Sequence, residues 1–194
     1  VYSSTRVCSP NRAEDRDLSD EILYPIFERI EDLGLNLFLH PSNVVEPARL
    51  AKYYLTNLVG NPTESAIAAA HLIFGGIMDR YPKLEVCLPH AGGSFPYLFG
   101  RFNHGAQVRA EMDHMEKDVI EYLRRFHYDT VSHSSEALTY LISLVGTDRV
   151  VLGSDYCFDM GYEHPVEVVT EHGGIDDKAT DLILVENAKR LLGL

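Results

Sequence analysis

The sequence predicts an α/β protein in which parallel strands alternate with helices. Short apolar segments typical of buried strands alternate along the chain with longer segments whose apolar residues have helical spacing. Strands separated by helices of this length indicate βαβ units, and successive βαβ units build a parallel sheet. Several of the strands also end in a side chain that can bind a metal, and in a parallel sheet such strand ends lie on one face.

Five strands are expected, most of them short apolar runs. They span residues 1–7, 35–40, 84–90, 125–131 and 149–155. The segments between and after them are expected to contain helices. These span residues 18–34, 47–60, 61–82, 93–112, 134–146 and 174–194. Five strands make slightly more than half of an eight-stranded (β/α)8 barrel.

Some of the predicted helices have recognisable ends. Ser19 is the expected N-cap of the first helix, and Asp176 or Asp177 is the expected N-cap of the last. Within the helix predicted over 61–82, the pair Gly75 and Gly76 is expected to weaken the helix locally, because glycine is a poor helix former.

The bulk composition is that of an ordinary globular protein. The 194 residues are 45% hydrophobic and 24% charged, which is enough to bury a core in one domain. The net charge of −12 and the lack of a Lys/Arg run argue against nucleic acid or an anionic membrane as a partner. No apolar run reaches the length of a membrane span, and no signal peptide is expected. Three scattered cysteines argue against a disulfide scaffold and predict a reducing, cytoplasmic compartment.

Three of the predicted strands end in metal-capable side chains. These are His40 in LFLHP, His90 in VCLPHAGG and Asp155 in VLGSDY. Because the carboxyl ends of parallel strands lie on one face, we expect the three side chains to converge. Imidazole nitrogen and carboxylate oxygen suit Zn²⁺ or a similar divalent ion, and a carboxylate at the end of a buried strand needs a compensating partner. The sequence therefore predicts a metal site that takes further ligands from elsewhere.

Each of these residues also has an ordinary structural explanation. His40 could be a core histidine bonded to a backbone carbonyl, the glycines after His90 could form a simple turn, and Asp155 could cap a turn. Their joint position at three strand ends favours a shared site. Arg101 is the best candidate to hold an anionic substrate, because guanidinium pairs bidentately with carboxylates, although a solvated surface arginine is the alternative. Asp129, at another strand end, either faces the same site or bonds to a loop.

The other histidines and three tyrosines show no spacing typical of ligands. Tyr53, Tyr54 and Tyr97 fall at helical positions and are expected in the core. Six other histidines are interpreted as surface or helix-packing residues: His71, His114, His127, His133, His164 and His172.

Four segments of the chain resemble the amidohydrolase superfamily, in the branch that contains aminocarboxymuconate-semialdehyde decarboxylase and the aromatic-acid decarboxylases. They are LFLHP, LIFGGIMDRYPKLEVCLPHAGGSFPYLFGRFNHG, FHYDTVSHSSEALTYLISLVGTDRVVLGSDYCF and ENAKRLLGL, and they cover nearly the whole chain. The family fold is a (β/α)8 TIM barrel with a divalent metal at its C-terminal face. The resemblance implies that residues 1–194 are the C-terminal part of one such barrel domain, covering about strands four to eight.

The same resemblance implies roles for four residues. His40 and Asp155 would be metal ligands from the fifth and eighth barrel strands. His90, at the end of the sixth, would be the catalytic acid/base beside the metal, and Asp155 could share the catalytic handling of a proton. Arg101 matches an arginine that binds the substrate carboxylate from the neighbouring subunit of a homodimer.

The resemblance has three departures. The HxH or ExH pair of the family's first strand has no counterpart in this chain. Ser42 and Asn43 follow HP, where a tryptophan is usual in the decarboxylase, and Cys157 stands where proline is common. The identity of the substrate is therefore left open by the sequence.

The implied function is metal-dependent decarboxylation of an aromatic or unsaturated carboxylic acid, with Zn²⁺ as the first choice of cofactor and Mn²⁺ as the second. The expected partners are a small carboxylic acid and a second copy of the chain. Hydrolysis of a lactone, amide or C–C bond is the alternative, because it would use the same groups. A truncated, non-catalytic half-barrel is a third hypothesis, since an open half-barrel exposes sheet edges.

Overall fold

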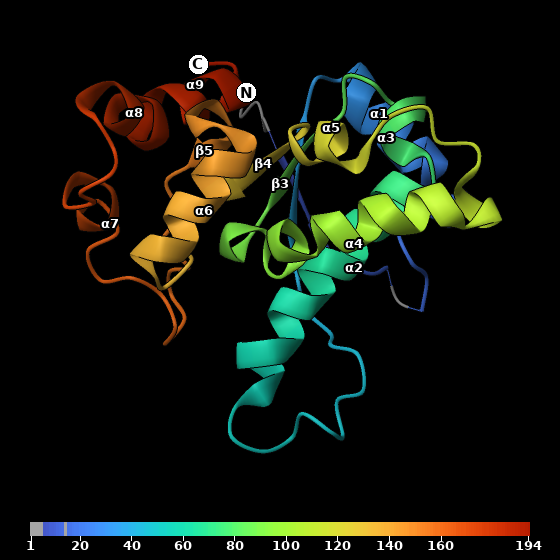
Figure 1. The fold of residues 1–194 in the computed structure, drawn as a ribbon, viewed down its shortest axis with the longest axis horizontal. Coiled ribbons are helices and arrows are strands. Elements are labelled where there is room, and N and C mark those ends of the chain that lie inside the picture. Colours follow the sequence, from blue (N-terminus) through green and yellow to red (C-terminus); the bar gives the residue numbers. More distant parts are fainter. Residues whose placement is uncertain (1–5, 14) are drawn as a thin grey trace.

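The computed structural model describes residues 6–13 and 15–194, and its centre is a parallel sheet of five strands (Figure 1). The strands follow one another across the sheet in the order of the sequence, and each neighbouring pair is parallel. They are β1 (Arg6–Pro10), β2 (Asn36–His40), β3 (Glu85–Leu88), β4 (Phe126–Asp129) and β5 (Val150–Val151). This order of parallel strands is that of a (β/α)8 barrel, so the predicted fold class is confirmed at the level of sheet topology.

Helices occupy most of the connections between the strands. The longest are α1 (Tyr24–Asp32), α2 (Asn61–Phe74), α4 (Phe95–Val108) and α6 (Ser135–Val145). Shorter ones are α3 (Ile77–Arg80), α5 (Val119–Leu123) and α7 (Glu167–Thr170). The chain closes with α8 (Asp177–Asp181), a π-helical turn over Leu182–Glu186, and α9 (Asn187–Leu192). Of these, α5 and α7 were not predicted, because each forms only about one turn.

The hydrophobic core lies between the sheet and these helices. Alternate strand residues point to the helical layer and are almost fully buried, as Leu37, Val86, Leu88 and Val150 illustrate. Phe95 on α4 packs edge-to-face against the ring of Phe126 on β4, with ring centroids 5.8 Å apart. This one-sided burial follows from the period of two residues in a strand, and it leaves the other residues of each strand on the opposite face.

Several predicted helix ends agree with the structure, and one does not. Asp176 caps α8 by accepting a hydrogen bond from the backbone N–H of Ala179 at 2.8 Å. The glycine pair separates α2 from α3, as expected. Ser19 is not the first cap, because Asp20 accepts from the N–H of Ile22 instead. The expected first strand continues further than predicted, because β1 extends to Pro10, and residues 1–5 of the expectation lie outside the described part.

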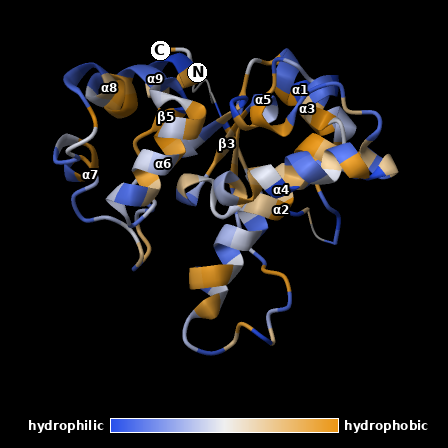
Figure 2. Cartoon of the chain, viewed as in Figure 1, coloured by the Kyte–Doolittle hydropathy of each residue, from blue (hydrophilic) through white to orange (hydrophobic). Residues whose placement is uncertain are grey.

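The helix predicted over 47–60 is wrong for most of its length. Only the π-helical turn Thr56–Gly60, which leads into α2, is helical. Residues 41–55 form turns that project from the body of the molecule, with hydrophobic residues on the projection (Figures 1 and 2). Tyr53 and Tyr54 both have φ of 59°, which no right-handed helix allows. The side chains of Tyr53, Tyr54 and Tyr97 are all exposed, so the prediction that these three tyrosines lie in the core is also wrong.

Two further observations concern the predicted environment of the chain. Cys8, Cys87 and Cys157 are all free, in agreement with the expectation that they form no disulfide scaffold. Among the described residues, none of the helices combines the length and the hydrophobicity that crossing a lipid bilayer requires.

Candidate metal centre

His40 is the last residue of β2 and reaches the carboxyl-terminal face of the sheet. Its neighbour Leu39 turns into the helical core at 2% exposure, so the alternation of the strand directs His40 to the opposite side. The side chain of His40 is 46% exposed. Its ring stacks on the ring of Phe158, with centroids 5.8 Å apart and an interplanar angle of 13°. This stacking fixes the plane of the imidazole while its nitrogens stay accessible.

His90 follows β3 in a turn of unusual backbone conformation. His90, Ala91, Gly92 and Gly93 all have positive φ, at 55°, 54°, 80° and 59°. A Cβ at Gly93 would lie 2.3 Å from the carbonyl oxygen of Pro62, and one at Gly92 would lie 2.7 Å from the ring of Tyr128. Glycine is therefore required at both positions by close packing as well as by φ.

The carboxylate of Asp129, the last residue of β4, holds this turn in place. It accepts hydrogen bonds from the backbone N–H groups of His90 at 3.1 Å, Ala91 at 2.7 Å and Val131 at 3.0 Å. Burial raises the pKa of Asp129, although these amides and the neighbouring His90 act in the opposite direction. Of the two roles that the sequence allowed for Asp129, the structure therefore shows bonding to a loop.

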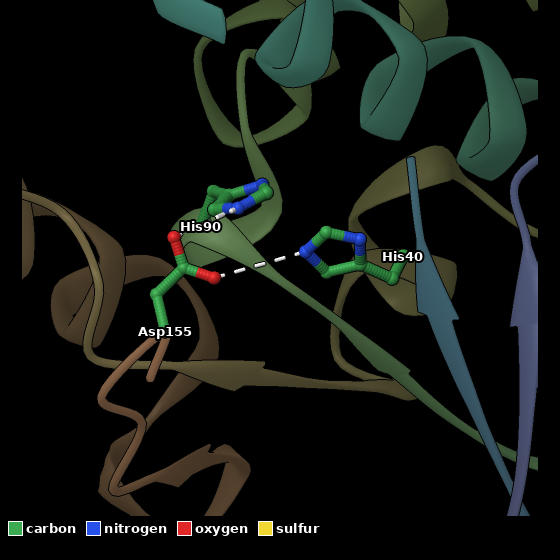
Figure 3. A group of neighbouring side chains, drawn as sticks. All are labelled: His40, His90 and Asp155. Atoms are coloured by element: carbon green, nitrogen blue, oxygen red, sulfur yellow. Dashed lines mark ion pairs between the residues drawn. The ribbon is translucent and has the colours of Figure 1, made fainter. Parts of the chain in front are cut away.

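Asp155 lies four residues beyond β5 and faces both histidines (Figure 3). Its Oδ1 is 3.7 Å from His40 Nε2, and its Oδ2 is 3.8 Å from His90 Nε2. Its side chain is 10% exposed, and its backbone has φ of 53°. The structure thus brings together the three residues that the sequence expected to converge, but only His40 ends a strand, since His90 and Asp155 lie in the loops after β3 and β5.

The three side chains fit a divalent cation. One potential ligand atom from each of His40, His90 and Asp155 lies within 4.8 Å of the other two. Two atoms bonded to one ion at 2.0–2.1 Å are at most about 4.2 Å apart, and the separations of His40 Nε2 from Asp155 Oδ1 and of His90 Nε2 from Asp155 Oδ2, 3.7 and 3.8 Å, each fall within that span. The ligand nitrogens of His40 and His90 lie within 4.8 Å of each other. A small inward movement of the half-exposed His40 side chain would bring both within reach of one ion. Two imidazoles and one carboxylate also have the chemistry that Zn²⁺ and similar ions prefer.

The electrostatic environment of His90 favours its neutral form. Burial lowers the pKa of His90, and the nearby His40 and His133 lower it further, while the carboxylates of Asp129 and Asp155 act against this. Its Nδ1 is buried and has no hydrogen-bond partner among the described residues. A neutral imidazole keeps a lone pair that can bind a metal or accept a proton.

A cavity of about 340 Å³ opens beside His90 and Asp155. Its other lining residues come from the start of α2 and from the loops after β3, β4 and β5: Asn57, Leu58, Asn61, Pro62, Gly93, Val131, Ser132, His133 and Met160. His133 was interpreted from the sequence as a surface or packing residue, and that interpretation missed its place on the cavity wall. The signal was available, because His133 follows β4 closely, as His90 follows β3.

Arg101 does not join this group. It lies on α4, is exposed, and is not among the residues that line the cavity.

Comparison with solved structures supports the barrel fold. The structure superimposes on 5-carboxyvanillate decarboxylase from Sphingomonas paucimobilis with a TM-score of 0.87 and 26% sequence identity. The match covers 98% of this chain and 58% of that one. The five strands therefore form part of a (β/α)8 barrel of the kind that the resemblance implied.

Comparison of sequences gives the family. The chain is 38% identical over 181 residues to 2-amino-3-carboxymuconate-6-semialdehyde decarboxylase from Dictyostelium discoideum, over 92% of this chain and 50% of the relative. It is 34% identical to the enzyme of that name from Caenorhabditis elegans, over 84% of this chain and 42% of the relative. The chain thus spans about half the length of the curated relatives it matches. The family model described as Amidohydrolase matches residues 8–194, and the chain belongs to this amidohydrolase family.

Proposed function

We propose that this chain supplies the C-terminal part of a single-domain, metal-dependent decarboxylase that acts on an aromatic or unsaturated carboxylic acid. The observation that carries the proposal is the convergence of His40, His90 and Asp155 at the carboxyl ends of three parallel strands. The similarity to relatives named as decarboxylases supports the choice of reaction. The free cysteines are compatible with a cytoplasmic location, which stays a prediction.

In this proposal His40 and Asp155 hold the metal, with ligands from the first barrel strand completing the site. Zn²⁺ is the first choice because a site of imidazoles and carboxylate suits it, and Mn²⁺ is the second. When bound, the ion supplies Lewis-acid polarisation of a substrate oxygen. The cavity beside Asp155 provides the space in which the acid lies.

His90 supplies the proton that replaces CO₂. The C–C bond to the carboxylate breaks, its electron pair stays on the substrate carbon, and the proton from His90 forms the new C–H bond. Because burial lowers the pKa of His90, its protonated form is a stronger acid than an ordinary imidazolium. The hydrogen bonds from the turn to Asp129 keep the ring beside Asp155 and the cavity.

The first test uses the complete protein, including the part that precedes this chain in its relatives. CO₂ release is measured for a panel of aromatic and unsaturated acids. Hydrolysis products without CO₂ would contradict decarboxylation and favour the hydrolytic alternative. Metal removal by a chelator should abolish turnover, and separate addition of Zn²⁺ and Mn²⁺ shows which ion restores it.

Variants separate the proposed roles. His40→Ala and Asp155→Asn should each lower the metal content measured by elemental analysis, because each removes a ligand. His90→Gln should keep most of the metal and reduce kcat by about 100-fold or more, the range expected for loss of a general acid. An Asp155→Asn variant with normal metal content and activity would refute the assignment.

A further inference from the structure

The loop that follows β5 and carries Asp155 is a compact unit, which we call the Asp155 loop (residues 154–162). At its two ends, the N–H of Tyr162 donates a hydrogen bond to the carbonyl oxygen of Ser154 at 2.8 Å. Inside it, the N–H of Phe158 donates to the carbonyl oxygen of Asp155 at 3.0 Å. Because these bonds close the loop on itself, a contact that holds one part of the loop also holds Asp155.

The projection that follows His40 reaches the Asp155 loop from a distant part of the chain. The hydroxyl of Tyr54 donates a hydrogen bond to Oδ1 of Asp159 at 2.8 Å, across 105 residues of sequence. The base of the projection is fixed in turn, because the carboxylate of Glu64 on α2 accepts a hydrogen bond from the N–H of Val45 at 2.6 Å. Glu64 is buried, which strengthens this bond. The bond between Tyr54 and Asp159 therefore ties the Asp155 loop to an anchored segment.

This bond lies next to the contact that the loop makes with His40. Asp159 directly follows Phe158, whose ring stacks on the ring of His40. Tyr54 has φ of 59°, a conformation that a tyrosine keeps only where its surroundings determine it. The hydrogen bond to Asp159 raises the pKa of Tyr54, so the hydroxyl remains a donor at neutral pH. Two adjacent residues of the Asp155 loop thus contact the segment that begins at a proposed metal ligand.

We propose that Tyr54 is a positioning residue for Asp155: through Asp159 its hydroxyl holds the Asp155 loop against the metal position and slows the release of a bound ion. The inference rests on the metal site of the proposed function and uses no step of its reaction. An ion can leave only when Asp155 moves away from the two histidines. Because the loop is closed on itself, this movement also separates Asp159 from Tyr54. Groups that hold a ligand from outside the ligand set commonly tune metal binding in this way.

The test measures metal release, so it does not depend on turnover. The complete protein is loaded with Zn²⁺ and mixed with an excess of a chromogenic chelator, whose absorbance reports the rate of release. Tyr54→Phe removes only the hydroxyl, Asp159→Ala removes the acceptor, and Asp159→Asn retains a carbonyl acceptor. Tyr53→Phe is the matched control, because Tyr53 is the adjacent tyrosine, has the same φ and forms no hydrogen bond through its hydroxyl in the described part of the chain.

The rate constant for Zn²⁺ release should rise about fivefold in Tyr54→Phe and in Asp159→Ala, the effect expected for loss of one hydrogen bond. The double variant should release Zn²⁺ no faster than either single variant, because both substitutions remove the same bond. Asp159→Asn should retain most of the wild-type behaviour, and Tyr53→Phe all of it. The urea midpoint of the metal-free protein should be the same in every variant, which separates positioning from a general loss of stability.

A wild-type release rate in Tyr54→Phe would overturn the proposal, as would effects of the two substitutions that multiply in the double variant. Faster release accompanied by a lower urea midpoint would also overturn it, because the hydroxyl would then stabilise the fold as a whole. Failure of the wild-type protein to bind Zn²⁺ would refute the metal site and this inference together. Absence of CO₂ release by a protein that does bind Zn²⁺ would count against the proposed reaction alone.

Discussion

At the scale of single residues, the site depends on groups that support the side chains facing the metal position. Asp129 bonds to the N–H of His90 and to that of Ala91, and so holds a turn of four consecutive residues with positive φ. Backbone conformations of this kind persist only where the surroundings determine them. Asp129 is therefore a positioning residue for His90.

Replacing Asp129 by Asn tests this role. The amide has nearly the same shape, but one of its acceptors becomes an NH₂ group that faces backbone donors. We expect kcat to fall about 10- to 100-fold with KM changed less than about threefold, because a misplaced acid affects the chemical step more than binding. Metal content should stay normal, and Asp148→Asn, in the 3-10 turn Thr147–Arg149 before β5, should behave as wild type. A change in KM alone would show that Asp129 acts on substrate binding instead.

The sequence could predict the three converging side chains but not the residues that support them. His40, His90 and Asp155 were recognisable because each ends a predicted strand, and strand direction alone places such residues on one face. Asp129 also ends a strand, but its carboxylate oxygens accept hydrogen bonds from a turn. The positive φ values of that turn cannot be predicted from the apolar pattern of the sequence. His133 is exposed, as expected for a surface residue, but the sequence interpretation did not place it on the cavity wall.

At the scale of helices and strands, the predictions from the sequence agree with the structure where local side-chain chemistry determines the element. The helix predicted over 134–146 is found over Ser135–Val145, with the Ser134 hydroxyl accepting from the N–H of Ala137. The amphipathic face of this helix was visible in the sequence, whereas its cap was not predicted. The helix predicted over 47–60 had apolar spacing but projects away from the body, so it lacks the packing that stabilises most short helices.

The contact between α3 and α5 gives a prediction at this scale. Asp79 on α3 accepts hydrogen bonds from Lys117 at 2.6 Å and from the hydroxyl of Tyr122 on α5. Burial alone would raise the pKa of Asp79, but the hydrogen bonds from Lys117 and Tyr122 outweigh it, so the pKa is lowered. Because the pKa of Asp79 is lower in the folded state than in the unfolded state, its carboxylate stabilises the fold at pH values above the unfolded-state pKa of about 4. This stabilisation is lost as the pH falls through the folded-state pKa.

Asp79→Asn should therefore reduce the free energy of unfolding of the complete protein at pH 7 by about 1 kcal/mol. The difference from wild type should shrink as pH is lowered from about 4 towards 2. Urea titrations at several pH values measure both effects. Asp113→Asn is the control, because the Asp113 side chain is exposed and forms no hydrogen bond in the described structure. A difference that persists at the lowest pH would show that the carboxylate charge is not responsible.

At the scale of the whole molecule, the position of Arg101 bears on the predicted homodimer. Arg101 is exposed on α4 and lies apart from the cavity in its own chain. The predicted homodimer would let this guanidinium pair with a substrate carboxylate in the site of a second copy. Each site would then combine His90 of one chain with Arg101 of the other.

Mixing two inactive variants tests this arrangement. Complete proteins with Arg101→Ala and with His90→Gln are unfolded together and refolded, so that subunits exchange at random. Half of the dimers then contain one chain of each kind, and one of their two sites has both residues intact. One quarter of all sites are then intact, so about one quarter of the wild-type activity should return. No recovery in mixed dimers, confirmed by differently tagged chains, would place Arg101 outside the shared site.

His40 and Asp155 contact each other although β2 and β5 are three strands apart in the sheet. In a flat sheet, strands separated by three spacings are about 14 Å apart. The curvature of a barrel wall, together with the loop that carries Asp155, brings their side chains to 3.7 Å. The affinity of the site for a metal should consequently depend on how strongly the sheet curves. A substitution in the core that flattens the sheet should weaken metal binding even when every ligand residue is intact, so apparent metal-site defects in this family can originate in the packing beneath the strands.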